Sequence, residues 1–154
     1  MGGFFAVAAR HNCASDLFFG TDYHSHLGTQ RGGMAVRHAD RISRAIHDIT
    51  NAPFRTKFEA DLPRFQGQLG IGVISDYDDQ PVLVGSHLGT FAVITVGVIQ
   101  NLKELVASAF RNGRHHFSEM GGGMYNPTEV MAAIISQEDL FPPGSKFLSV
   151  RNRR

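Results

Sequence analysis

Three short runs in the middle of the chain constrain its fold more than any other feature. Residues 69–74, 82–84 and 91–96 are apolar, rich in β-branched side chains and free of charge. An acidic turn at 76–79 separates the first run from the second. Apolar runs without polar alternation are typical of strands that are covered on both faces. We therefore expect a layered α/β protein in which helices cover the sheets.

The remaining strands are expected in the first third of the chain. Residues 3–9 form an apolar run that predicts a buried strand. Residues 34–36 and 42–49 predict a pair of strands joined by a turn at 39–40. The polar, glycine-containing segment 29–33 is expected to form a turn before this pair.

Helices are expected mainly after the strands. A helix begins at Asn101, where apolar residues recur at a spacing of three and four. Another begins at Asn126, because Pro127 suits the first helical turn. Near the start of the chain Ser15 can cap a helix. We expect that helix to be interrupted at 20–22, where a glycine, a threonine and an aspartate follow one another.

The composition argues against several classes of partner. The 154 residues include 15 Lys and Arg against 14 Asp and Glu, a net charge of +1 without a basic stripe, so no nucleic-acid partner is expected. No apolar stretch approaches the roughly 20 residues of a membrane span, so no membrane partner is expected. Cys13 is the only cysteine. It excludes an internal disulfide and a cysteine-based zinc cluster, and it favours a cytoplasmic location.

Motifs for metals and cofactors are incomplete. His24 and His26 stand two residues apart, a spacing that points them to different faces of a helix, so we expect no metal. The Gly-Ile-Gly segment at 70–72 lacks the third glycine of a dinucleotide fingerprint, so we expect no cofactor. Cys13 has basic neighbours that could activate its thiol, and a buried, inert cysteine is the alternative.

The first residues resemble a family of enzymes. The Met-Gly-Gly-Phe-Phe start, followed by a strand, resembles the Met-Cys-Gly-Ile start of class II glutamine amidotransferases. In that family the methionine is removed, and the exposed cysteine attacks glutamine with its own α-amine as base. Arg31 and Gly32 match an Arg-Gly pair of the family, Gly97 matches the glycine of its His-Asn-Gly, and Thr128 and Glu129 match a later segment. The resemblance covers residues 1 to about 140, and amidophosphoribosyltransferases of purine synthesis are the nearest branch.

Four positions depart from the family pattern. Gly2 stands where the nucleophilic cysteine belongs, and Ser75 falls near the arginine that holds the glutamine carboxylate. Val96 falls at the asparagine of the oxyanion hole, and Pro127 near the aspartate that holds the glutamine amine. We therefore expect no catalytic residues, only a vestigial glutamine site. Its positions are Gly2, Arg31, Gly32, Ser75, Val96, Gly97 and Pro127.

The resemblance also implies an architecture and partners. Residues 1–154 are expected to form the N-terminal part of a four-layer αββα sandwich of the N-terminal nucleophile hydrolase type. Its later strands, and a phosphoribosyltransferase domain, are expected to follow the apolar stub and basic end at 147–154. Glutamine or a related small molecule, a second copy of the chain or that further domain are the expected partners. Two other functions stay open: an active glutamine-dependent amidotransferase, for example through Cys13, and a small-ligand binding or regulatory module in the vestigial pocket.

Overall fold

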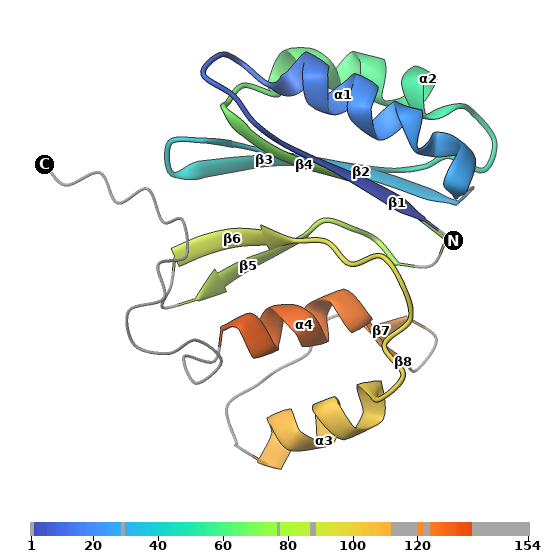
Figure 1. Ribbon diagram of the computed structural model, residues 1–154, viewed down its shortest axis with the longest axis vertical. Coiled ribbons are helices and arrows are strands. Elements are labelled where there is room, and N and C mark those ends of the chain that lie inside the picture. Colours follow the sequence, from blue (N-terminus) through green and yellow to red (C-terminus); the bar gives the residue numbers. More distant parts are fainter. Residues whose placement is uncertain are drawn as a thin grey trace, which may run out of the picture.

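The described residues fold into a mixed α/β structure with antiparallel sheets and four α-helices (Figure 1). The structure is a computed structural model that describes residues 2–28, 30–76, 78–86, 89–111, 120–121 and 124–136. The strands are β1 (Gly3–Ala8), β2 (Arg31–His38), β3 (Arg41–Asp48), β4 (Leu69–Ser75), β5 (Val82–Ser86), β6 (Gly89–Val93), β7 (Met120–Gly121) and β8 (Met124–Tyr125). The α-helices are α1 (Ala14–Tyr23), α2 (Phe54–Phe58), α3 (Leu102–Arg111) and α4 (Pro127–Ile135), and the 3-10 helices are η1 (Ser25–Leu27) and η2 (Glu59–Arg64).

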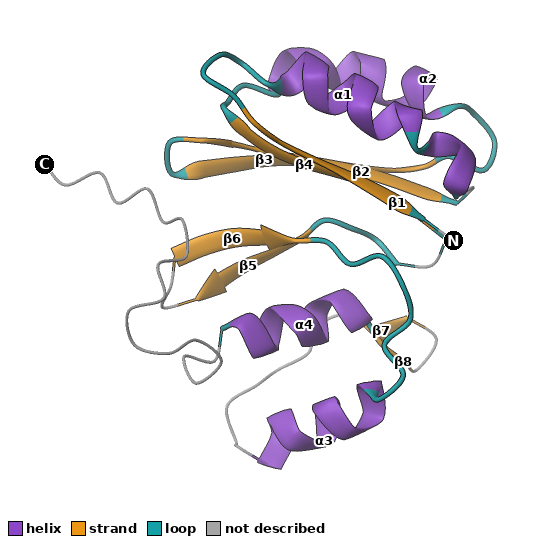
Figure 2. Cartoon of the chain, in the orientation of Figure 1, coloured by secondary structure: helices purple, strands orange, loops and turns teal. Residues whose placement is uncertain are grey.

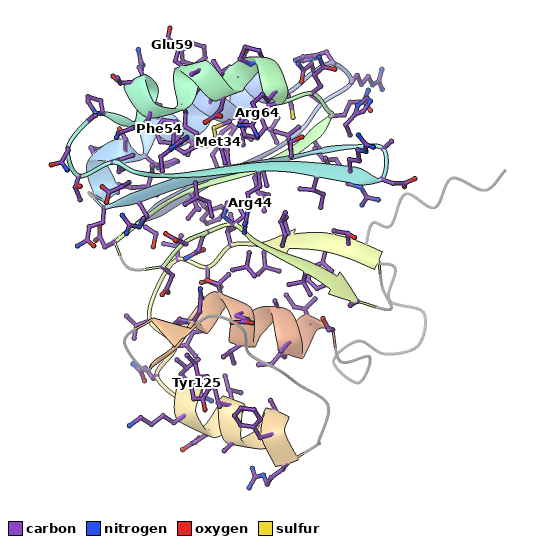
Figure 3. All side chains as sticks on the ribbon, turned by 180° about the vertical axis from the view of Figure 1, so that it is seen from behind. Met34, Arg44, Phe54, Glu59, Arg64 and Tyr125 are labelled. Atoms are coloured by element: carbon purple, nitrogen blue, oxygen red, sulfur yellow. The ribbon has the colours of Figure 1, made fainter. Side chains whose placement is uncertain are left out.

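The first half of the chain forms a four-stranded antiparallel sheet in the order β1-β4-β2-β3. The helices α1 and α2 cover one face of this sheet (Figure 2). Side chains that alternate along β2, Met34 and Val36, point into the layer between sheet and helices and are fully buried. They pack there with Phe54 and Phe58 of α2, whose rings stack with centroids 4.2 Å apart. The main apolar core therefore lies between the four-stranded sheet and its helices, where Figure 3 places Met34 and Phe54.

The opposite face of the sheet faces the second half of the chain. The hairpin β5–β6 lies on that side, α4 packs against the hairpin, and α3 packs against α4 (Figure 1). Arg44 of β3 reaches toward the hairpin layer (Figure 3), and its Nη1 donates a hydrogen bond of 3.0 Å to the carbonyl oxygen of Pro81. The expectation of a layered α/β protein is confirmed. Among the described residues, no helix is both long and apolar enough to cross a membrane.

Several expected elements are confirmed with small shifts. The β2–β3 hairpin turns at Ala39 and Asp40 as expected. The helix expected from Asn101 is α3, and Asn126 caps α4 by accepting hydrogen bonds from the backbone N–H groups of Thr128 and Glu129. The basic end of the chain, at 147–154, lies outside the described residues.

The expected break in the first helix is wrong. The helix α1 runs through Gly20 without interruption, because the missing side chain lets α1 lie close to β1. A Cβ on Gly20 would come within 2.4 Å of Cδ1 of Phe5. The hydroxyl of Thr21 donates to the Leu17 carbonyl one turn earlier, so this buried polar group is satisfied inside the helix.

Two boundaries also differ from expectation. The turn expected at 29–33 ends earlier, because Arg31 to Gly33 already pair with β3 and β4. The strand expected at 91–96 ends at Val93, so Val96 lies in the loop that follows β6. Two short strands, β7 and β8, form an antiparallel pair for which no strand was expected.

Candidate functional site

Three of the expected site residues lie side by side at one end of the four-stranded sheet. Strand register pairs Arg31 of β2 with Ser75 of β4, and Gly3 of β1 with Ile74. The same register continued by one residue places Gly2 beside Ser75, and a Cβ on Gly2 would lie 3.5 Å from the Ser75 Cα. The antiparallel pairing therefore assembles a row of Gly2, Ser75 and Arg31 from three separate segments.

Gly2 is packed where a side chain does not fit. A Cβ built on this residue would lie 2.2 Å from the carbonyl oxygen of Ile74 and 3.3 Å from its carbonyl carbon. Both atoms belong to the backbone of β4, the strand next to β1, so they cannot swing aside as a flexible side chain does. The space at residue 2 therefore suits glycine, which has no Cβ.

Arg31 is held by two carboxylates. Its Nη1 lies 2.5 Å from Oδ2 of Asp48 on β3, and its Nε lies 2.9 Å from Oδ1 of Asp79 in the β4–β5 connection. The hydrogen bond with Asp48 is the main reason that the pKa of Arg31 is raised above its ordinary value. Both ion pairs are half-exposed, so each contributes little stability. Their larger effect is to occupy Nη1 and Nε, two of the three nitrogen atoms that could bind a ligand carboxylate.

Asp48 is tied into this cluster from a second side. The hydroxyl and the backbone N–H of Thr50 both donate to its Oδ1. These two bonds, followed by the hydrogen bond from Arg31, lower the pKa of Asp48 from 3.8 to about 2. Asp48 therefore carries a negative charge at neutral pH and keeps the guanidinium of Arg31 paired.

The acidic turn after β4 adds further negative charge. The backbone N–H of Asp78 donates a hydrogen bond of 3.4 Å to the hydroxyl of Ser75. Burial, and then the charge of neighbouring Asp79, raise the pKa of the Asp78 carboxyl. Arg31 is thus matched by two carboxylates, and Asp78 is the neighbour of one of them, an arrangement that disfavours a negatively charged ligand at this end of the sheet.

Gly32 has a structural role in the core. It is a regular residue of β2 and is not among the residues with a positive φ. A Cβ on Gly32 would lie 2.9 Å from Cδ2 of Phe54 and 3.2 Å from Cε2 of Phe58. Its small size lets the stacked rings of α2 approach the sheet.

The other three site positions lie in the second half of the chain. Val96 and Gly97 belong to the loop after β6, where Val96 is 42% exposed. Gly97 has a φ of +126°, which an L side chain rarely adopts, and no atom lies within 4 Å of a Cβ built on it. Pro127 is the first residue of α4. Figure 1 shows this loop and the start of α4 at the same end of the molecule as the N-terminus.

A chain of hydrogen bonds joins the two groups of site positions. The backbone N–H of Thr95 donates to Oε1 of Gln80 over 2.7 Å, and the hydroxyl oxygens of Thr95 and Thr128 lie 2.5 Å apart. Gln80 is buried and directly follows Asp79, the partner of Arg31. Val96 and Pro127 are the sequence neighbours of Thr95 and Thr128. The structure therefore brings all seven expected positions to one end of the molecule, although Gly32 faces the helices.

Sequence reasoning missed the residues that make these links. Asp48, Asp79 and Thr95 received no role, although the Gln80-Pro81 pair resembles a Gln-Pro of the family. That pair is joined by a cis peptide bond, and its Gln80 carbonyl lies where a Cβ on Gly33 would be, only 1.7 Å away. The signal that could have found this contact is the second glycine of the Gly32-Gly33 pair, which leaves room for the connection between the sheets.

Cys13 does not belong to this site. It is fully buried in the core beneath α1, where its Sγ would lie 3.3 Å from a Cβ on Gly70. Burial is the main reason that the pKa of its thiol is raised above 9.0, so the thiolate is disfavoured. The expectation that Cys13 is buried is confirmed, and its place in the core argues against the hypothesis of a displaced nucleophile.

Comparison with solved structures identifies the fold. Glutamine phosphoribosylpyrophosphate (PRPP) amidotransferase from B. subtilis, complexed with ADP and GMP, matches with a TM-score of 0.74 at 18% sequence identity. A second structure, of the allosteric regulatory enzyme of purine biosynthesis, matches equally well, also at 0.74 and 18%. The chain shares the fold of these amidotransferases.

The match extends over most of this chain and a minor part of the other. It covers 92% of this chain and 30% of each matched chain. The resemblance to a glutamine amidotransferase domain is thus confirmed at the level of the fold. No family model matches the sequence, and no curated protein does so either.

Proposed function

We propose that this chain is a glutamine-amidotransferase-like domain of an amidophosphoribosyltransferase-like protein, and that it has no glutaminase activity. The observation that carries the proposal is the position of Gly2. It precedes β1 at the end of the sheet where the other site positions gather, and the Ile74 carbonyl occupies the space that a side chain on residue 2 would need.

The proposed loss of activity follows from the chemistry of amide hydrolysis. Covalent catalysis requires a nucleophile that forms an acyl-enzyme and splits one difficult step into two easier ones. Gly2 offers no thiol or hydroxyl, and Cys13 lies in the core away from the site. Val96 has no side-chain hydrogen-bond donor for a developing oxyanion, and loss of one such donor typically costs about 3 kcal/mol of transition-state stabilisation.

Recognition of glutamine is also expected to be weak. Its carboxylate needs a cation, and Arg31 is already bound by Asp48 and Asp79. Binding glutamine there would first require breaking those contacts, and the ligand would then compete with two carboxylates held in place by the fold. Arg31, with Asp48 and Asp79, is therefore proposed to form a structural joint between β2, β3 and the β4–β5 connection.

We extend the proposal to the complete protein. The layer order in Figure 2, helices, sheet, hairpin and helix, supports a four-layer αββα sandwich of which this chain supplies the N-terminal part. The 30% coverage of the matched structures supports further strands and a phosphoribosyltransferase domain beyond this region. A cytoplasmic transferase of purine biosynthesis is the proposed parent.

An electrophilic analogue of glutamine tests the absence of a nucleophile. The purified chain is incubated with a glutamine-like diazoketone and digested, and peptides containing Gly2 and Cys13 are examined by mass spectrometry. We expect no adduct on either peptide while the protein is folded, and alkylation of Cys13 by a small generic reagent after unfolding. A stoichiometric diazoketone adduct on the native protein would refute the proposal.

A further inference from the structure

A pocket among the described residues lies away from the amidotransferase-like site. A pocket of about 430 Å³ opens between the four-stranded sheet and the β5–β6 hairpin. Its walls include Ala8 at the end of β1, Leu69 at the start of β4 and Arg37 near the end of β2. Arg31 lies six residues before Arg37 on the same strand, which corresponds to about 20 Å. The pocket is therefore at the opposite end of the sheet.

Small side chains create this hollow. Ala6 and Ala35 line it from the four-stranded sheet, together with Ile71 of β4. Phe91 and Ala92 of β6 line it from the hairpin side. Larger residues at the alanine positions would fill the space between the two sheets. The walls are thus apolar and shaped by residues that leave room, as in pockets for small molecules.

Polar groups stand at the rim. Arg37 is exposed, and its Nε donates a hydrogen bond of 3.0 Å to the carbonyl oxygen of Ala39 in the β2–β3 turn. Within the described part of the chain, the two Nη atoms of Arg37 have no ion-pair partner, in contrast to the doubly paired Arg31. The hydroxyl of Thr90 on β6 also lines the pocket. A guanidinium that is held at its Nε beside an apolar hollow favours a carboxylate on an apolar body.

We propose that this pocket binds an aliphatic monocarboxylate, such as a medium-chain fatty acid. The methylene chain lies between Ala6, Ile71 and Phe91, where burial removes it from water. The carboxylate accepts hydrogen bonds from the Nη atoms of Arg37 at the rim. This site does not depend on the amidotransferase-like site, so either can fail without the other.

Titration of the purified full chain with a series of fatty acids tests the proposal. Hexanoate, octanoate and decanoate are compared by isothermal calorimetry below their micelle concentrations, with octanol as the uncharged partner of octanoate. Each added methylene should strengthen binding about fourfold until the pocket is full. Octanol should bind about tenfold more weakly than octanoate, because it cannot pair with Arg37. Absence of saturable binding by all three acids would overturn the proposal.

Variants assign the binding to this pocket. Arg37→Gln should weaken octanoate about tenfold, and Arg111→Gln, an exposed arginine at the end of α3, should leave it unchanged. Ala6→Phe fills the hollow from an exposed strand position, so it should abolish binding while thermal unfolding stays cooperative. Equal affinities in all three variants would place the ligand elsewhere and contradict the assignment.

A second copy of the chain is the competing occupant of the same apolar surface. Analytical ultracentrifugation with and without octanoate separates the two cases. We expect the sedimentation coefficient to be unchanged by octanoate. If octanoate instead converts a dimer to a monomer, the pocket is part of an interface between copies, and the small-ligand proposal is wrong.

Discussion

The backbone of Gly2 runs so close to Ile74 that a Cβ on residue 2 would lie 2.2 Å from the Ile74 carbonyl oxygen. The contact joins the start of β1 to the end of β4, the two strands that β-sheet register places side by side. A nucleophilic side chain at residue 2 would need this backbone to move. The geometry thus links the glycine at residue 2 to the way the sheet is packed at its end.

Adding a side chain at residue 2 should destabilise the protein. Gly2→Ala forces the start of β1 away from β4, and overpacking of this kind costs about 1–3 kcal/mol. Gly85→Ala is the matched control, because no atom lies within 4 Å of a Cβ built there. The free energy of unfolding is measured by urea denaturation. Equal stability of the two variants would show that residue 2 has room for a side chain.

Asp48 should make the stability of the protein sensitive to acid. Its folded pKa of about 2 lies below the ordinary 3.8, so its contribution is complete above the unfolded pKa and is lost as the pH falls through the folded one. Asp48→Asn should consequently lose less stability than the wild type between about pH 5 and about pH 2.

NMR titration of the Asp48 carboxyl can separate the contributions of Thr50 and Arg31 to this pKa shift. Thr50→Ala should raise the pKa of Asp48 more than Arg31→Gln does, since the Thr50 hydroxyl is the largest cause of the shift. The reverse order would mean that the ion pair with Arg31 dominates.

The hydroxyl contact between Thr95 and Thr128 should stabilise the junction of β6 and α4. Thr128 is fully buried, so Thr128→Val leaves Thr95 without this partner and is expected to cost about 1–2 kcal/mol. Thr95→Val should cost less in the Thr128→Val background than in the wild type, which a double-mutant cycle measures. Thr56→Val, on the exposed side of α2, serves as the control. If the double variant loses the sum of the stability losses of the two single variants, a direct interaction between Thr95 and Thr128 is excluded.

The β2–β3 turn contains a strained residue that can be relieved. Ala39 has a φ of 52°, a left-handed conformation that glycine adopts without steric cost. Ala39→Gly should therefore raise the free energy of unfolding by about 0.5–1 kcal/mol, because the strain that it relieves exceeds the entropic cost of glycine. Ala45→Gly, within β3, should lower it. A loss of stability in Ala39→Gly would mean that the turn holds Ala39 without strain.

Local patterns in the sequence predict much of the fold. The turn at Ala39–Asp40 and the helix start at Asn126 depend on residues close together in the chain, and both were expected correctly. The break predicted in α1 failed because Gly20 was judged by its low helix propensity. Its contact with Phe5 on another element outweighs that propensity, and such contacts cannot be read from neighbouring residues.

In the candidate site, too, the sequence predicted some features, whereas others depend on tertiary contacts. The resemblance to amidotransferases selected Gly2 and Arg31, and the antiparallel register brings them to one end of the sheet. The carboxylates that pair with Arg31 come from β3 and from the β4–β5 connection, and only tertiary folding places Asp48 and Asp79 beside it. Sequence spacing does not show that Asp48 and Asp79 lie beside Arg31, so the two ion pairs of Arg31 could not be predicted.

Release of glutamate from glutamine tests the central claim most directly. The purified chain is incubated with glutamine at neutral pH, and glutamate is measured by an enzyme-coupled assay against a buffer blank and a heat-unfolded sample. The account predicts a rate equal to both controls, for the wild type and for Gly2→Ala alike. Release of glutamate above the controls by the folded wild type would contradict it.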